Sequence, residues 1–201
     1  MPKTASESVR TFLDPYCDVQ VGTFSNRSDA QPFYSHMRPE EASTAFAKRG
    51  WNFVEFYRFM TVRNPWDRLA SLYFMIQRNR GLAIDKRGFV NWIDRLDPNH
   101  PSLPSHAAAK WISHGTMSVE AFASGAANVS LVQDFYRIED ELPKLKDTLS
   151  SMGIPTDGRL MPFLNRSDAT YDYKELYTAT AAARVLELYG PEIERFKYGL
   201  R

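Results

Sequence analysis

The sequence contains a single cysteine, Cys17, among its 201 residues. One thiol cannot close a disulfide within the chain, and it cannot build a cysteine-based metal centre. Histidine is also scarce: the chain has four, and none of them stands in an HExxH pattern or a similar ligand spacing. We therefore expect neither a disulfide framework nor a bound metal.

Long apolar runs and an excess of one charge are also missing. No run approaches the roughly 18 residues that span a bilayer, and the first ten residues lack the apolar core of a signal peptide. Lys and Arg total 25 against 24 Asp and Glu, a net charge of +1. This balance gives no broad basic field for nucleic acid or an anionic membrane. We expect a cytoplasmic protein with no nucleic-acid partner and no membrane segment, which holds any anion by local geometry.

What the chain does have is the composition of a globular protein. Hydrophobic residues make up 43% and charged residues 24%, and the length suits one domain covering residues 1–201. Segments typical of strands and helices alternate along the chain. This alternation predicts an α/β fold with a parallel sheet flanked by helices. The predicted strands are 55–62 and 128–133, and the main predicted helices are 5–13, 38–49, 65–80, 143–152 and 172–189.

The strongest local pattern is a strand-to-helix turn at residues 61–65. Asn64 can cap a helix, Pro65 suits its first position, and apolar residues follow at helical spacing. Arg63 then ends the strand at the carboxyl edge of the sheet, where α/β proteins place phosphate sites. We infer a candidate anion site at this turn.

Further along the same predicted helix, Arg68 and Ser71 lie three residues apart and therefore on one face. An arginine beside a hydroxyl can clamp a phosphate. The alternative is that the arginines of this segment are surface residues paired with a helix acid such as Asp67.

A second candidate anion site is the segment PKTASES at residues 2–8, which opens a predicted helix. Lys3 supplies a point charge, and the N–H groups and dipole of a helix N-terminus favour an anion. Hydroxyls come from Thr4, Ser6 and Ser8. The segment is not a Walker A motif, because GxxxxGK[ST] is absent. The alternative is a charged N-terminal helix that binds nothing.

Taken together, the two segments resemble the cofactor motifs of sulfotransferases. PKTASES resembles their 5′-phosphosulfate loop, and VRNPWDRLASLY resembles their 3′-phosphate signature. The stretches PFLNRSDATYDYKELYT and VLELYGPEIERFKYGL resemble the closing segment of the carbohydrate sulfotransferases, the group that includes heparan sulfate 2-O-sulfotransferases and short bacterial homologues. VQDFYRIEDEL extends the match. The resemblance implies a P-loop-like sulfotransferase fold.

The resemblance also implies an activity. Such enzymes move a sulfuryl group from 3′-phosphoadenosine-5′-phosphosulfate (PAPS) to an acceptor hydroxyl, here expected on a carbohydrate, and release 3′,5′-adenosine bisphosphate without a metal. The residues that match the family's motifs divide into three sets. The 5′-phosphosulfate would be held by Lys3, Thr4, Ser6 and Ser8, the 3′-phosphate by Arg63 and Ser71, and the nucleotide would be covered by a loop that contains Arg166.

Two residues are the expected catalysts. Lys3 can stabilise the negative charge that develops on the bridging oxygen as the sulfur–oxygen bond breaks. The attacking hydroxyl needs a base, and histidine suits this task near neutral pH. His36 is the only histidine between the two cofactor motifs, as the base is in the 2-O-sulfotransferases. His106 is the second choice, and a loop histidine without a catalytic role is the alternative for His36.

Two departures from the family keep other functions open. The family has an apolar strand directly before its PKT sequence, whereas only Met1 precedes Pro2 here. Either the start was placed at an internal methionine, or the chain is truncated, or the first strand is lost. Glu7 also replaces a small or hydroxyl residue and would repel phosphosulfate if it were desolvated. A non-catalytic nucleotide- or partner-binding protein of the same fold is therefore the main alternative. An ATP-dependent kinase-like enzyme is disfavoured because the Walker glycines are missing.

Overall fold

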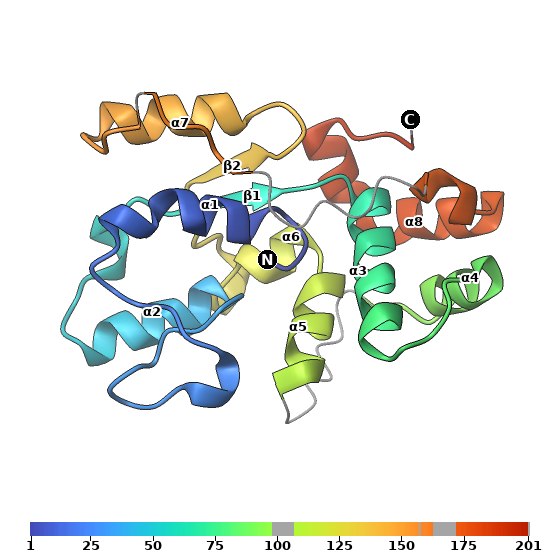
Figure 1. Ribbon diagram of the computed structural model, residues 1–201, viewed down its shortest axis with the longest axis horizontal. Coiled ribbons are helices and arrows are strands. Elements are labelled where there is room, and N and C mark those ends of the chain that lie inside the picture. The colour runs from blue at the N-terminus through green and yellow to red at the C-terminus, as the bar shows by residue number, and fades with distance from the viewer. Residues whose placement is uncertain (98–106, 157, 163–171, 201) are drawn as a thin grey trace. The chain divides into compact units, whose positions relative to one another are not determined.

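The computed structural model describes residues 1–97, 107–156, 158–162 and 172–200 (Figure 1). The described chain contains two strands, β1 (Phe59–Val62) and β2 (Asp134–Arg137), among helices. The α-helices are α1 (Ser6–Leu13), α2 (Pro39–Lys48), α3 (Pro65–Asn79), α4 (Lys86–Asp94), α5 (Ala107–Thr116), α6 (Val119–Ala123), α7 (Leu142–Ser151) and α8 (Ala179–Phe196). Short 3₁₀ helices are η1 (Asp14–Tyr16), η2 (Phe24–Asn26), η3 (Phe53–Glu55), η4 (Ala126–Asn128) and η5 (Tyr173–Leu176).

These elements group into two compact units. The described residues of the first unit fall within Met1, Lys3–Val62 and Phe122–Leu164. Those of the second fall within Pro2, Arg63–Ala121 and Asn165–Arg201. The first unit therefore contains both strands with α1, α2 and α7, and the second contains α3, α4, α5 and α8.

The first unit is built on the parallel pair of β1 and β2, with Phe59 opposite Asp134 and Val62 opposite Arg137. The parallel pairing that the sequence predicted is confirmed. Residues 60–62 of β1 are all buried, which is typical of a strand in a parallel sheet. Apolar side chains of α1, β2 and α7 form one core in this unit: Val9, Phe12, Tyr136, Leu145 and Leu149.

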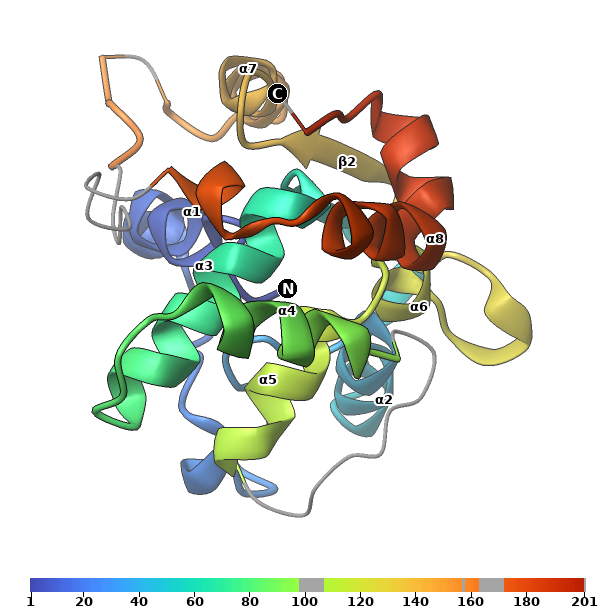
Figure 2. The ribbon, with the colours of Figure 1, turned by 90° about the vertical axis from the view of Figure 1, so that its right-hand side faces the viewer.

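The second unit is a helical assembly around α3, which packs against α5 and α8, while α4 packs on α8 (Figure 2). The start of α3 follows the sequence prediction: the side chain of Asn64 accepts a hydrogen bond from the Trp66 N–H at 3.1 Å, and Pro65 takes the first helical position. One core joins α3, α4, η5 and α8, and it includes Leu69, Phe89, Leu176, Val185 and Tyr189. The helices of this unit thus pack through faces of aromatic and aliphatic side chains that recur at helical spacing.

The strand predicted at 128–133 is wrong, and the strand predicted at 55–62 is too long. The second strand instead begins at Asp134, and β1 begins only at Phe59. The side chain of Ser130 accepts a hydrogen bond from the Val132 N–H at 3.2 Å and donates one to the Val132 carbonyl at 2.9 Å. A local side-chain bond of this kind competes with a strand ladder. Residues 129 and 131 also bond the backbone of residues 125 and 123, so this segment does not continue the sheet.

The helix predicted at 172–189 begins too early, and its predicted end is a kink rather than a terminus. Residues 173–176 form η5, and α8 starts after Thr178, whose hydroxyl accepts a hydrogen bond from the Ala181 N–H at 3.1 Å. At the other end, the helix does not stop at Pro191 but runs on to Phe196. Tyr189, with φ −122° and ψ 18°, leaves the helical geometry two residues before the proline. This kink lets the chain accept a proline inside the helix.

Candidate functional site

The N-terminal loop lies at the carboxyl end of β1. The hydroxyl of Thr61, the next-to-last residue of β1, donates to the carbonyl oxygen of Thr4 at 2.6 Å. The Thr4 hydroxyl in turn donates to the carbonyl oxygen of Met1 at 2.9 Å, and Thr4 is fully buried. Thr4 therefore attaches the loop to the strand. The carboxyl edge of a parallel sheet is where α/β proteins bind ligands.

The backbone of this loop alternates in handedness. Lys3 has φ 64° and Ala5 has φ 55°, both in the left-handed region, whereas Thr4 between them does not. In the backbone arrangement called a nest, left-handed residues alternate with right-handed ones and successive N–H groups can bind an anion. Ala5 is also the N-cap of α1 and has no side chain that could cap the helix. The loop thus presents backbone donors and the positive end of a helix dipole together.

A non-glycine residue in the left-handed region carries strain of about 1–2 kcal/mol. We expect Ala5→Gly to maintain or raise the free energy of unfolding, by up to about 1 kcal/mol, because glycine adopts this conformation without strain. The matched control is Ala42→Gly in the second turn of α2, which should cost about 1 kcal/mol. Urea unfolding of both variants measures the difference. Equal losses in the two variants would show that the loop conformation of Ala5 is not strained.

Of the other predicted residues of the N-terminal motif, Lys3 lies in the loop, and Ser6 and Ser8 lie in the first turn of α1. Ser6 and Lys3 are half-buried, and Ser8 is buried. Glu7 is exposed, so its carboxylate is hydrated and repels a nearby anion far less than a desolvated one would.

His36 belongs to the same unit as this loop. It is half-buried and has φ 63°, in a turn where the Met37 N–H donates to the carbonyl oxygen of Tyr34 at 3.2 Å. The residue before it, Ser35, accepts a hydrogen bond from the Arg10 guanidinium of α1 at 3.1 Å. The histidine turn is thus tied to the helix that begins at the N-terminal loop.

The predicted 3′-phosphate residues belong to the second unit. Arg63 is half-buried and makes two hydrogen bonds of 2.8 Å, from Nε and Nη2, to the carboxylate of Asp67. This is the pairing with a helix acid that the sequence left open. Ser71, two turns into α3, is only 3% exposed. In this structure both residues are therefore engaged or covered rather than open to solvent.

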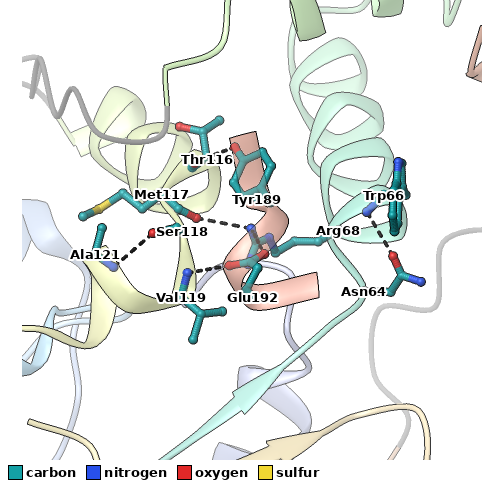
Figure 3. Close-up of polar contacts among 10 residues, drawn as sticks. All are labelled: Asn64, Trp66, Arg68, Thr116, Met117, Ser118, Val119, Ala121, Tyr189 and Glu192. Carbon is teal, nitrogen blue, oxygen red and sulfur yellow. Dashed lines mark hydrogen bonds and ion pairs between the residues drawn. The ribbon is translucent and has the colours of Figure 1, made fainter. Parts of the chain in front are cut away.

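Arg68 is the centre of a buried polar network in the second unit (Figure 3). Arg68 and Glu192 are 0% and 1% exposed, and Arg68 Nη2 lies 2.8 Å from Glu192 Oε1. The same nitrogen donates to the Met117 carbonyl at 3.2 Å, and Glu192 Oε2 accepts the Val119 N–H at 2.6 Å. Tyr189 lies beneath the guanidinium and donates its hydroxyl proton to the Thr116 carbonyl at 2.6 Å. Arg68 therefore joins α3, α8 and the start of α6 and is not available as a phosphate ligand.

Burial raises the pKa of the Glu192 carboxyl to about 7, although the Arg68 guanidinium and the Val119 N–H both act to lower it. An acid whose pKa is higher in the folded than in the unfolded chain takes up a proton on folding. This group therefore makes the free energy of unfolding fall as the pH rises from about 4.5 to about 7.

Some predicted residues lie outside the described part of the chain. Arg166 and His106, the covering-loop arginine and the second candidate base, are both among them. The described candidates divide by unit. Lys3, Thr4, Ser6, Ser8 and His36 belong to the first unit, and Arg63 and Ser71 to the second.

Sequence reasoning missed two contacts that the structure shows, Arg10 with Ser35 and Arg68 with Glu192. Arg10 gave no signal, because its partner Ser35 is 25 residues away in a loop. The Arg68–Glu192 pair has a weak signal in the sequence. Glu192 follows Tyr189 by three residues, which places an acid on the apolar face of a helix. A charge at such a position is buried only with a partner.

Within the described residues, no group of three or more His, Cys, Asp or Glu side chains could hold a metal ion. Among the same residues, no helix combines the length and the apolar character needed to cross a membrane. Comparison of the chain with protein-family models, curated proteins and solved structures gave no match.

Proposed function

We propose that the protein is a sulfotransferase that moves a sulfuryl group from PAPS to a hydroxyl, most simply that of a carbohydrate. The observation that carries the proposal is the loop at Met1–Ala5. It lies at the carboxyl end of a buried parallel strand, alternates in backbone handedness and opens an α-helix. Each of these features favours a bound anion, and Lys3 adds the charge. The resemblance of PKTASES and VRNPWDRLASLY to sulfotransferase motifs indicates that the anion is the phosphosulfate of PAPS.

In this proposal the acceptor hydroxyl attacks the sulfur atom of PAPS. The acceptor oxygen–sulfur bond forms while the bond from sulfur to the bridging oxygen of the 5′-phosphate breaks. His36 takes the hydroxyl proton, and 3′,5′-adenosine bisphosphate leaves with the bridging oxygen's negative charge. Lys3 and the N–H groups of the loop stabilise that charge as it develops. The remaining contribution is positioning, as in phosphoryl transfer.

The 3′ side of the nucleotide would use Arg63 and Ser71. Arg63 already binds an anionic group, because its guanidinium holds the Asp67 carboxylate by two hydrogen bonds. A guanidinium presents several donors in a fixed plane, so a phosphate can share it with the carboxylate or replace it. Arg166 would add a third contact from the segment that follows residue 162.

The test is a transfer assay with ³⁵S-labelled PAPS and unsulfated polysaccharides, heparosan and chondroitin, as hydroxyl acceptors. The proposal predicts label in the polysaccharide and an equal amount of 3′,5′-adenosine bisphosphate. His36→Ala should lower the rate about 10²–10⁴-fold, the usual contribution of a general base. Labelled polysaccharide made equally fast by His36→Ala would remove the histidine from the mechanism. No transfer to any hydroxyl acceptor would contradict the proposed reaction.

A second candidate function has a specific observation in its favour. The Arg63 guanidinium is paired with the Asp67 carboxylate, and Ser71 is buried. Both observations are expected of a non-catalytic protein that retains the fold. A protein of this kind would bind the nucleotide without transferring the sulfuryl group, or would not bind the nucleotide at all. The same assay separates the two, because only the enzyme consumes PAPS.

A further inference from the structure

We propose that Arg10 is a positioning residue that fixes the His36 turn against helix α1. The inference rests on the proposed function, since it concerns the base of that reaction. Arg10 is exposed and lies one helical turn beyond Ser6, and its Nη1 donates to the Ser35 hydroxyl at 3.1 Å. Ser35 is the residue directly before His36. A single side chain thus connects the helix of the phosphosulfate loop with the turn that carries the base.

The His36 turn is fixed along the chain on both sides. Before it, the Ser35 N–H donates to the Gly22 carbonyl at 3.0 Å, and the Gly22 N–H donates to the Phe33 carbonyl at 3.0 Å. After it, the Arg38 N–H donates to the Glu41 carboxylate at 3.0 Å, in the capping box of α2. These bonds hold the ends of the turn in its own loop, whereas the Arg10 bond points across to α1. Among these contacts, the Arg10 bond is the one that links the turn to α1.

The conformation of His36 shows why such a bond matters. A histidine at φ 63° is in a region that costs a non-glycine residue free energy and that persists only where neighbours enforce it. A base must also lie within hydrogen-bond reach of the proton that it takes. A displacement of about 1 Å can cost two orders of magnitude in rate. Because α1 begins at the loop that would hold the sulfuryl donor, a bond from α1 to the turn sets the distance that catalysis needs.

The first experiment is a mutant cycle in the ³⁵S-PAPS transfer assay. Arg10→Ala should lower kcat about 10- to 100-fold, with KM for PAPS within about twofold of wild type. Arg10→Lys should recover part of the loss, because lysine can still donate to Ser35. In the His36→Ala background, Arg10→Ala should have no further effect, since the residue acts through the histidine. The matched control is Arg80→Ala, an exposed arginine at the end of α3, which should keep wild-type rates.

An unchanged kcat in Arg10→Ala would overturn the inference, and so would an equal loss in the His36→Ala background. A second readout does not require turnover. Amide hydrogen exchange at residues 35–37 should accelerate about five- to tenfold in Arg10→Ala, because one hydrogen bond that holds the turn is lost. If wild type transfers nothing, the proposed function has failed, and unchanged exchange at these amides would then also overturn the role of Arg10.

Discussion

Replacement of Lys3 by alanine should lower the rate of sulfuryl transfer about 10²–10³-fold while the chain stays folded. A donor aimed at charge that develops in the transition state contributes about 3–4 kcal/mol to the barrier. Lys3 is half-buried in the loop at the end of β1, and a low local dielectric strengthens its charge there. Stability should change little, since Thr4 and Thr61 attach the loop to β1.

The measurement is the initial rate with ³⁵S-PAPS, with thermal unfolding as the check on folding. Lys48→Ala, at the exposed end of α2, is the matched control and should keep wild-type rates. Lys3→Ala should also lose more in kcat than in KM, because the stabilised charge appears mainly in the transition state. Turnover of Lys3→Ala within about threefold of wild type would remove Lys3 from the catalytic role.

Removal of the buried cation in the second unit should have the largest effect on stability. Arg68→Met preserves much of the side-chain volume but leaves the Glu192 carboxyl buried without its partner at 2.8 Å. We expect a loss of about 3–5 kcal/mol at pH 8, the usual cost of breaking a buried ion pair. Without Arg68 the pKa of Glu192 rises further above 7, because the guanidinium is one of the groups that lower it. Near pH 5 the carboxyl is protonated in both proteins, so the loss should be smaller there.

Urea unfolding at pH 5 and pH 8 measures both losses. The double variant Arg68→Met with Glu192→Leu should recover most of the stability at pH 8, since a packed apolar pair often matches a buried ion pair. Glu187→Gln removes the acid of the exposed pair with Arg184, where the Glu187 side chain is 68% exposed, and should cost at most about 1 kcal/mol. A pH-independent loss in Arg68→Met would show that packing, not charge, is what Arg68 contributes.

The sequence was most informative where a local signal and the packing agree. Asn64 and Pro65 mark the start of α3, and the structure has the predicted cap. A parallel sheet was also predicted, since strands separated by helices are usually parallel, although its second strand lies at 134–137 and not at the predicted 128–133. The cap of α3 depends on residues that are near neighbours in the chain, so the sequence alone is enough to predict it.

The failures occurred where tertiary contacts or competing local bonds decide the structure. Residues 128–133 have strand propensity, but the Ser130 side chain bonds its own backbone and the strand starts at Asp134. Pro191 normally ends a helix, yet the kink at Tyr189 and the anchored Glu192 carry α8 past it. In the candidate site, the residue types of the N-terminal motif could be named from the sequence. The left-handed backbone at Lys3 and Ala5 and the contact from Arg10 to Ser35 could not, since they depend on the folded loop.

The most direct test of the central claim is nucleotide binding by isothermal titration calorimetry. We expect 3′,5′-adenosine bisphosphate to bind at least tenfold more tightly than 5′-AMP or ATP, because Arg63 and Ser71 would recognise a phosphate on the 3′ side. Arg63→Ala should remove that preference, whereas Arg80→Ala should leave it intact. Equal affinity for 5′-AMP and the bisphosphate, or no binding of either nucleotide, would contradict the proposal that this protein binds PAPS.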